Sequence, residues 1–217
     1  MYTPAHFAVT DAAALHDLIR QHPLGMLVTH SGGALDANHL PCELLAGEDG
    51  QTTLIAHVAR ANPVWQQLQD GDAVLVVFRA EDGYISPNWY PSKHEAHRQV
   101  PTWNYRVVHA HGTVTIRQDE KFLLGVTGRL TRTHEARTQA QAPQDHAAWK
   151  MSDAAPDYLQ QMLGAIVGLE IRITRLEGKF KLGQNRSPAD LQGAADGVDA
   201  VGQTALAAQM RQHGQRE

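Results

Sequence analysis

The sequence predicts an α+β protein made mainly of antiparallel β-sheet, with peripheral helices around a barrel. About six or seven short segments have the alternating or β-branched pattern of strands. Turn residues separate most of them by only a few positions, so hairpins connect them, and a hairpin makes its two strands antiparallel. The sequence has no regular alternation of strands and helices, which excludes a doubly wound fold.

The first half of the chain predicts two helices and three strands. Thr10 caps the first helix, and Pro23 ends it because the residue before a proline leaves the helical region. Asn62 caps a short second helix, in which Pro63 takes the first position. The strands between them are residues 25–30, 35–45 and 52–58, with Pro41 marking an edge or a bulge and turns at 31–33 and 48–50.

The second half predicts further strands and helices around polar stretches. In order, these are a strand at 73–80, a long ordered loop at 82–102, a strand at 103–117, a helix at 120–130, a polar linker at 137–145, a helix at 156–163, a strand at 166–175 that 179–183 extends after a turn at Gly178, and a helix starting at 187–190. Residues 204–212 form a weak helix or fray.

Length and composition bound the class of protein. A chain of 217 residues is one domain, or one domain with appendages, and 42% hydrophobic with 19% charged residues is a globular composition. It lacks the roughly 20 consecutive apolar residues that span a bilayer, and its N-terminus does not resemble a secretion signal. The single cysteine, Cys42, excludes an intrachain disulfide and a cysteine-based zinc site. We therefore expect a cytoplasmic protein without a membrane segment.

The charge balance does not favour DNA binding. Lys and Arg total 19 against 23 Asp and Glu, a net charge of -4 with a pI near 6.3. Neutralising phosphates supplies most of the affinity of DNA-binding domains, so these usually carry a basic footprint. The average charge lacks that footprint, although a local basic patch stays open.

The segment 57–65 (HVARANPVW) indicates an anion site. A strand ends, Arg60 follows, and a capped helix begins, which places free backbone N–H groups beside a bidentate cation. The alternative is an ordinary strand-to-helix turn with a surface arginine.

A late polar cluster and a set of aromatic residues allow two interpretations each. The cluster is either the edge of a site for a polar heterocycle or a solvated strand end, and it consists of Lys179, Lys181, Gln184, Asn185 and Arg186. The aromatic set either walls a flat ligand or packs in the core and a dimer, and it consists of Trp89, Tyr90, Trp103 and Tyr105.

Metal binding and nucleophilic catalysis have weak support. His109 and His111 share one face of a strand, but a cupin-type glutamate does not follow, and HEAH at 94–97 misses the HExxH spacing. The sequence has no GxSxG, P-loop or GxGxxG motif, so we assign no metal ligand and no catalytic residue. Cys42 is expected to be a buried small hydrophobe.

Several separated blocks together resemble the PaiB family of FMN-binding negative transcriptional regulators. They are HLP at 39–41, HVARANPVW at 57–65, YISPNWYPSK at 84–93, VPTWNY at 100–105, VVHAHG at 107–112, and IVGLEIRI at 166–173 with GKFKLGQNR at 178–186. The resemblance implies a split β-barrel of the flavin-binding type over residues 1–195, followed by a tail at 196–217 that is a weak helix or disordered. It also implies a bacterial homodimer that binds FMN in a groove at the subunit interface and represses transcription.

The resemblance also implies an FMN-binding set of twelve residues. These are His39, Leu40, Pro41, His57, Ala59, Arg60, Asn62, Trp103, Asn104, Lys181, Gln184 and Asn185. Arg60 would grip the phosphate, residues 39–41 would run along the isoalloxazine through their backbone, and the cluster at 181–185 would close the site from the partner subunit. The sequence departs from the family pattern at Cys42, His111 and Gly183, where that pattern often has an aromatic residue, a tyrosine and a serine.

Three functions follow from this resemblance and from the residues. The first is a flavin-binding regulator, in which FMN is a structural or sensing ligand. The second is an FMN-dependent oxidoreductase, either an NAD(P)H:flavin reductase or a relative of the pyridoxamine phosphate oxidases, in which the cofactor carries the redox chemistry and a catalytic triad is not required. The third, suggested by the 13 histidines, is a haem-binding or haem-degrading protein on a related barrel.

Overall fold

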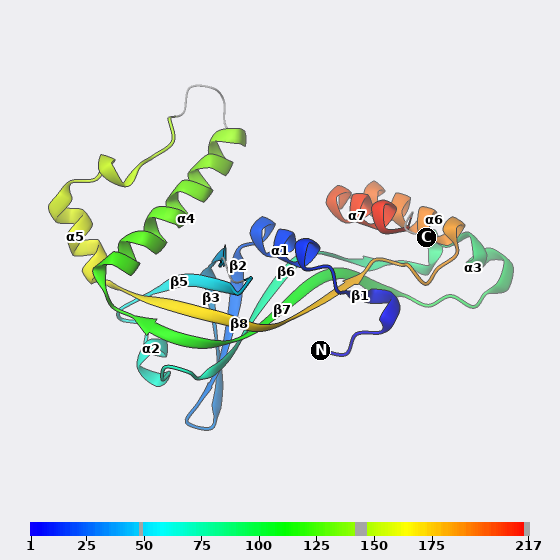
Figure 1. Cartoon of the computed structure of the whole chain (residues 1–217). Helices are drawn as coiled ribbons and strands as arrows, with labels where there is room; N and C mark the ends of the chain where they lie inside the picture. The colour runs from blue at the N-terminus through cyan, green and yellow to red at the C-terminus, as the bar shows by residue number, and fades with distance from the viewer. Residues whose placement is uncertain (48–49, 142–146, 215–217) are drawn as a thin grey trace. The chain divides into compact units, whose positions relative to one another are not determined.

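The computed structural model describes residues 1–47, 50–141 and 147–214 and contains one mainly antiparallel sheet with peripheral helices (Figure 1). The sheet order is β3-β2-β6-β7-β8-β5-β4, and β1 pairs with β8. The strands are β1 (Ala8–Val9), β2 (Leu24–Ser31), β3 (Ala34–Pro41), β4 (Glu43–Ala46), β5 (Thr52–Ala59), β6 (Ala73–Ile85), β7 (Thr102–Arg117) and β8 (Ile166–Lys181). The predicted fold class is confirmed.

Seven α-helices and three short 3-10 turns accompany the sheet in the described residues. They are α1 (Ala12–Gln21), α2 (Val64–Gln67), α3 (Pro91–Ala96), α4 (Glu120–Gln141), α5 (Pro156–Gly164), α6 (Pro188–Ala200) and α7 (Thr204–Gly214), with short 3-10 turns at η1 (Ala5–Phe7), η2 (Pro87–Trp89) and η3 (Met151–Asp153). Within the described ranges, no helix combines the length and the apolar character that a membrane span requires.

The chain divides into two compact units. Unit 1 comprises Met1–Leu18, Phe78–His109 and Leu176–Glu217, and unit 2 comprises Ile19–Val77 and Ala110–Arg175. The long strands β6, β7 and β8 each contribute residues to both units.

Unit 2 contains the β2–β3 hairpin and the pairings of β5. β2 and β3 form a tight hairpin in which Gly32 and Gly33 have φ of 57° and 81°, the left-handed values that a type I′ turn requires. β5 pairs antiparallel with β4 and with β8, and it also contacts β3 although these two strands lie far apart in the sheet order. Val126 and Leu130 of α4 pack against Ile55 of β5 and so cover this part of the sheet.

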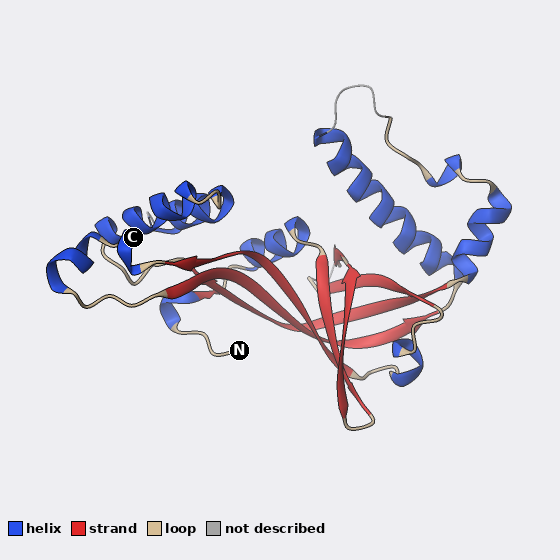
Figure 2. Ribbon diagram, turned by 180° about the vertical axis from the view of Figure 1, so that it is seen from behind, coloured by secondary structure: helices blue, strands red, loops and turns tan. Residues whose placement is uncertain are grey.

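Unit 1 holds β1 against β8 and contains the C-terminal helices (Figure 2). The turn predicted at Gly178 is wrong, because this glycine lies inside β8 and pairs with Val9. A Cβ at position 178 would lie 2.1 Å from Cδ2 of Leu15, so this glycine serves a close approach rather than a turn.

The helices α6 and α7 pack together in unit 1, side by side in both views. Residue 195, the expected end of the barrel domain, lies within α6. Beyond it, Val198, Leu206 and Met210 are buried, so residues 196–214 form packed structure, and the helix predicted at 204–212 is present.

Other predicted boundaries change for local physical reasons. The strand predicted at 35–45 is two strands, β3 and β4, which are separated at Cys42. The N–H of Cys42 donates to the carbonyl of Pro23 at 2.9 Å. The segment predicted as a loop at 82–102 contains the end of β6, η2 and α3, since Pro87 and Pro91 each take the first helical position.

Two helix ends also differ from the prediction. Oδ1 of Asp11, rather than Thr10, accepts from the N–H of Ala13 at 3.0 Å at the start of α1. The helix α4 continues through residues 137–141 of the predicted linker, and residues 142–145 of that linker lie outside the described residues. Part of the turn predicted at 48–50 lies outside them as well.

Candidate functional site

Arg60 lies in unit 2 directly after β5, and main-chain carbonyls hold its guanidinium. Its Nε donates to the carbonyl of Gly164 at 2.8 Å and its Nη2 to that of Ile166 at 3.0 Å. Its Nη1 donates to Oε1 of Gln118 at 2.9 Å, and the guanidinium carbon lies 5.8 Å from the centre of the Trp65 ring. These three bonds, counted among the described residues, leave two of the five guanidinium N–H donors for a ligand.

Arg60, rather than a helix dipole, dominates the predicted anion site. The helix α2 has only four residues, so its dipole is small. The helix begins at Val64 with Pro63 at the N-cap, one residue later than predicted, and Oδ1 of Asn62 accepts from the N–H of Val64 at 3.0 Å.

Asn62 also joins the two segments of unit 2 that the sequence predicts for the flavin. Its Nδ2 donates to Oδ1 of Asn38 at 2.7 Å, which connects the segment after β5 to β3. β3 is the first strand of the sheet order, so its outer edge offers backbone N–H and C=O groups. His39 is exposed on this strand and Leu40 is buried, so the backbone is the accessible feature there.

His57 has a buried nitrogen without a partner. Its Nδ1 has no hydrogen-bond partner among the described residues, although His57 lies in the middle of β5 opposite Gly168 of β8. Burial lowers the pKa of His57, so the imidazole is neutral near pH 7. An orphaned buried nitrogen is uncommon in folded proteins and marks a place where a ligand group could complete the hydrogen bonding.

Unit 1 holds the second predicted group, and Lys181 is its centre. Lys181 Nζ donates to the carbonyl of Trp103 at 2.7 Å and to Oγ1 of Thr102. Burial, with the nearby charges of Lys179 and Arg186, lowers the pKa of Lys181. The structure therefore brings Lys181 beside Trp103, in a cationic cluster that favours an anionic or electron-rich ligand.

The other members of this group differ in accessibility. Gln184 accepts from the N–H of Leu182 at 2.8 Å and donates to the carbonyl of Phe180 at 2.5 Å, so its amide fastens its own turn. Asn104 is buried and Asn185 is exposed. Gly183 has a φ of 93°, which a serine would adopt only with strain, so the departure from the family pattern matches the backbone here.

The aromatic residues singled out in the sequence do not form one wall. Trp89 packs on α6, where a Cβ at Gly197 would lie 2.3 Å from its ring, and Tyr90 is buried. Trp103 is 53% exposed and meets Tyr84 edge to face at 6.3 Å between ring centres. Trp103 alone of this set joins an exposed aromatic pair.

Cys42 and the strand histidines complete the predicted candidates. Cys42 is buried as expected, and burial raises the pKa of its thiol to about 12, which disfavours the reactive thiolate. His109 and His111 lie two residues apart on β7 and are half-buried.

Sequence reasoning missed the groups that hold Arg60 and Lys181. These are the carbonyls of Gly164, Ile166 and Trp103, with the side chains of Gln118 and Thr102. Every residue has a carbonyl, so a pattern of residue types carries no signal for such contacts. Only the pairing of distant segments brings them to the two cations.

Comparisons with known proteins identify the family of this chain. The family described as "Putative FMN-binding domain" matches residues 1–175. The Bacillus subtilis "Protease synthase and sporulation protein PAI 2" is 30% identical over 190 residues, 88% of this chain and 85% of that protein. An uncharacterized protein of Emericella nidulans is 31% identical over 230 residues, 93% of this chain and 92% of its own, so similar proteins occur in fungi as well as bacteria.

The fold resembles that of a solved flavin-binding protein. The FAD and heme binding protein of Mycobacterium smegmatis superposes with a TM-score of 0.55 at 20% identity, over 81% of this chain and 74% of that one. At this identity the likeness concerns the fold alone. With the family match across the sheet and the extended similarity to the Bacillus protein, the chain belongs to the PaiB family of FMN-binding domains.

Proposed function

We propose that this protein binds FMN at a homodimer interface and acts in the cytoplasm as a flavin-dependent negative regulator of transcription. The observation that carries the proposal is Arg60, which backbone carbonyls hold while two of its N–H donors stay available for a phosphate. The segment that holds Arg60 is tied to the edge strand β3 through the bond between Asn38 and Asn62.

The residues of unit 2 fit the parts of FMN. Arg60 would take the phosphate, with the backbone at Ala59 and Asn62 beside it, and the edge of β3 at residues 39–41 would hydrogen-bond the polar rim of the isoalloxazine. His57 would offer its unpaired Nδ1 to the ligand. Bound FMN supplies redox chemistry, and the protein's residues bind it and orient it.

The homodimer supplies the remaining groups. We place Lys181, Trp103, Asn104, Gln184 and Asn185 of a second copy against the flavin, with the Lys181 ammonium as the positive charge that closes the site. An exposed aromatic pair, Trp103 with Tyr84, and the 67% exposed Val100 support an interface on unit 1, because contiguous exposed apolar residues mark association surfaces.

The regulatory role rests on similarity, and the net charge bears on how the protein would act on transcription. The name of the Bacillus relative refers to protease synthesis and sporulation, which are processes rather than reactions. With a net charge of -4, this chain has no general basic footprint, so we place the effect on transcription in a complex with a partner or in a local basic patch. Direct DNA binding would give a complex at moderate salt that weakens steeply as salt rises.

The first experiment measures FMN and riboflavin binding to the purified protein and to Arg60→Ala. Riboflavin lacks the phosphate, so we expect Arg60→Ala to weaken FMN about 10- to 150-fold, the range of a charge-assisted contact of about 1.5–3 kcal/mol, and to leave riboflavin unchanged. Arg129→Ala, an exposed arginine on α4, is the matched control. Equal weakening of both flavins would show that Arg60 has only a structural role.

The same preparation separates the regulator from the oxidoreductase. Oxidation of NADH or NADPH by the FMN-loaded protein at enzymatic rates would favour the reductase. If FMN binds and neither nucleotide is oxidised, the reductase alternative is removed and the regulator stays.

A further inference from the structure

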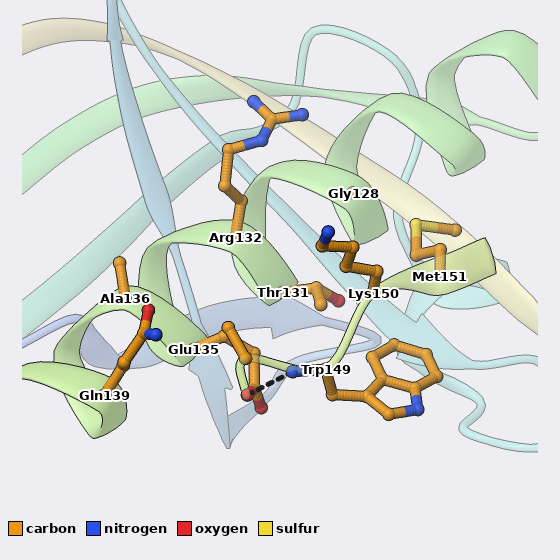
Figure 3. A pocket seen from close by; sticks show the side chains of 10 residues that line it. Gly128, Thr131, Arg132, Glu135, Ala136, Gln139, Trp149, Lys150 and Met151 are labelled. Carbon is orange, nitrogen blue, oxygen red and sulfur yellow. Dashed lines mark hydrogen bonds between the residues drawn. The ribbon is translucent and has the colours of Figure 1, made fainter. Parts of the chain in front are cut away.

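We propose that a cavity between α4 and residues 148–151 binds a small organic anion that carries a flat apolar group. The cavity lies within unit 2 and has a volume of about 480 Å³, inside the range of roughly 300–1,000 Å³ that small-molecule sites occupy (Figure 3). None of the residues that line it belongs to the proposed flavin site.

Two contacts attach the segment 148–151 to α4 and so fix the walls of the cavity. At one end, Met151 packs on α4, because a Cβ at Gly128 would lie 3.3 Å from its sulfur. At the other end, the N–H of Trp149 donates to Oε2 of Glu135 at 2.9 Å. Gly128 and Glu135 are seven residues apart, about two helical turns or roughly 10.5 Å. The residues of α4 that line the cavity run from Gly128 to Gln139, so both contacts fix residues 148–151 against this stretch of the helix.

The lining combines apolar surface with two cations. Trp149 is 45% exposed, and its indole offers a flat face, while Met151 adds polarizable surface. Arg132 and Lys150 have no carboxylate within ion-pair distance among the residues that the structure describes. The carboxylate of Glu135 faces the Trp149 amide instead.

The placement of these groups sets the orientation of the ligand. In Figure 3, the Lys150 side chain extends toward α4 near Gly128 and Thr131, and the Trp149 ring lies below it, to the right of the contact with Glu135. Arg132 extends away from that contact. A carboxylate or sulfonate would therefore sit at the Lys150 ammonium, Arg132 would add positive charge from a greater distance, and the flat group would cover the indole.

Other ligand classes use this lining less well. A cationic ligand would add a third positive charge to Arg132 and Lys150. Inorganic phosphate would leave the surfaces of Trp149 and Met151 uncovered. The charge and the apolar face together favour an aromatic acid.

The test uses 2-naphthoate as the probe and its neutral isostere 2-naphthamide as the comparison, both measured by titration calorimetry on the full chain. We expect saturable 1:1 binding of 2-naphthoate and at least fivefold weaker binding of 2-naphthamide. Arg132→Gln and Lys150→Gln should each weaken 2-naphthoate about two- to fivefold, as expected for partly solvated ion pairs. Arg129→Gln on the same helix is the matched control and should leave binding unchanged, and Trp149→Ala should weaken both probes.

Three results would overturn the proposal. They are no saturable binding of 2-naphthoate at millimolar concentration, equal binding of the neutral isostere, and equal effects of the Arg132 and Arg129 variants. Arg60→Ala should bind 2-naphthoate like the parent chain. The binding of 2-naphthoate therefore tests the cavity whether or not the flavin proposal holds, and the binding of FMN tests the flavin proposal whether or not the cavity binds 2-naphthoate.

Discussion

Replacing His57 with leucine should make the flavin-free protein more stable and FMN binding weaker. A buried polar atom without a partner costs about 1–3 kcal/mol, and His57 is only half-buried, so we expect a gain near the lower bound of about 1 kcal/mol. For a protein of this size, that corresponds to a rise in Tm of about 2–4 °C. Leucine has a similar size and needs no hydrogen bond, so the strand β5 should keep its packing.

The effect on FMN should have the opposite sign. If Nδ1 of His57 meets the flavin, its loss removes a hydrogen bond worth about 1 kcal/mol, or roughly fivefold in affinity. Thermal unfolding with and without FMN measures both quantities in one series, because a ligand at 100 times its Kd adds about 2.7 kcal/mol to the folded state. His30→Leu, an exposed histidine on β2, is the control and should move neither quantity.

The signs of the changes in Tm and in FMN affinity decide whether the argument holds. A lower Tm of flavin-free His57→Leu would show that the histidine stabilises the fold. An unchanged FMN-induced rise in Tm would show that Nδ1 does not face the ligand. Either result refutes the argument from the orphaned nitrogen.

Three further predictions test the fold and the electrostatics. The pKa of His57 is lowered in the folded state, so the unfolded chain binds the proton more readily. The contribution of neutral His57 to stability is therefore full above the ordinary histidine pKa of about 6.5 and is lost as the pH falls toward the lower folded value. His57→Leu should flatten the dependence of the unfolding free energy on pH in that acidic range. Cys42 should not react with a thiol reagent at pH 8 in the folded protein and should react fully after unfolding, since burial raises its pKa to about 12; labelling without unfolding would contradict its placement. Gly112→Ala should lower the free energy of unfolding in urea by about 2 kcal/mol or more, because its Cβ would lie 2.5 Å from the carbonyl oxygen of Arg172. Gly125→Ala on α4, where the position faces open space, should raise that free energy by about 0.5–1 kcal/mol. Equal effects of the two variants would show that the strands around Gly112 have room for a side chain.

The sequence predicts best those elements whose pattern is local. Residues 103–117 alternate, and β7 covers them almost residue for residue. The strand predicted at 35–45 fails at one point, because the bond from Cys42 to Pro23 is a tertiary contact that no local pattern contains. The same limit applies to Gly178, which resembles a turn residue in sequence and serves the approach of Leu15 in space.

In the candidate site, too, some residues follow from local sequence and the use of others depends on tertiary contacts. Arg60 and Asn62 follow from their positions at a strand end and a helix start, and the structure bonds Asn62 to Asn38 of β3. Gln184 matches the chemistry of a ligand-binding amide, yet its side chain fastens the backbone at residues 180 and 182. Residue type gives the chemistry available at a position, and the three-dimensional neighbours decide how that chemistry is used.

The carbonyl groups that hold Arg60 have a consequence for how the sequence can vary. Two of its three partners, at residues 164 and 166, are main-chain oxygens, which every amino acid supplies. Only Gln118 contributes through its side chain. Substitutions at 164 and 166 are therefore limited by packing and backbone conformation and not by recognition of the guanidinium. Related chains can accumulate differences at these two positions while the arginine keeps its orientation.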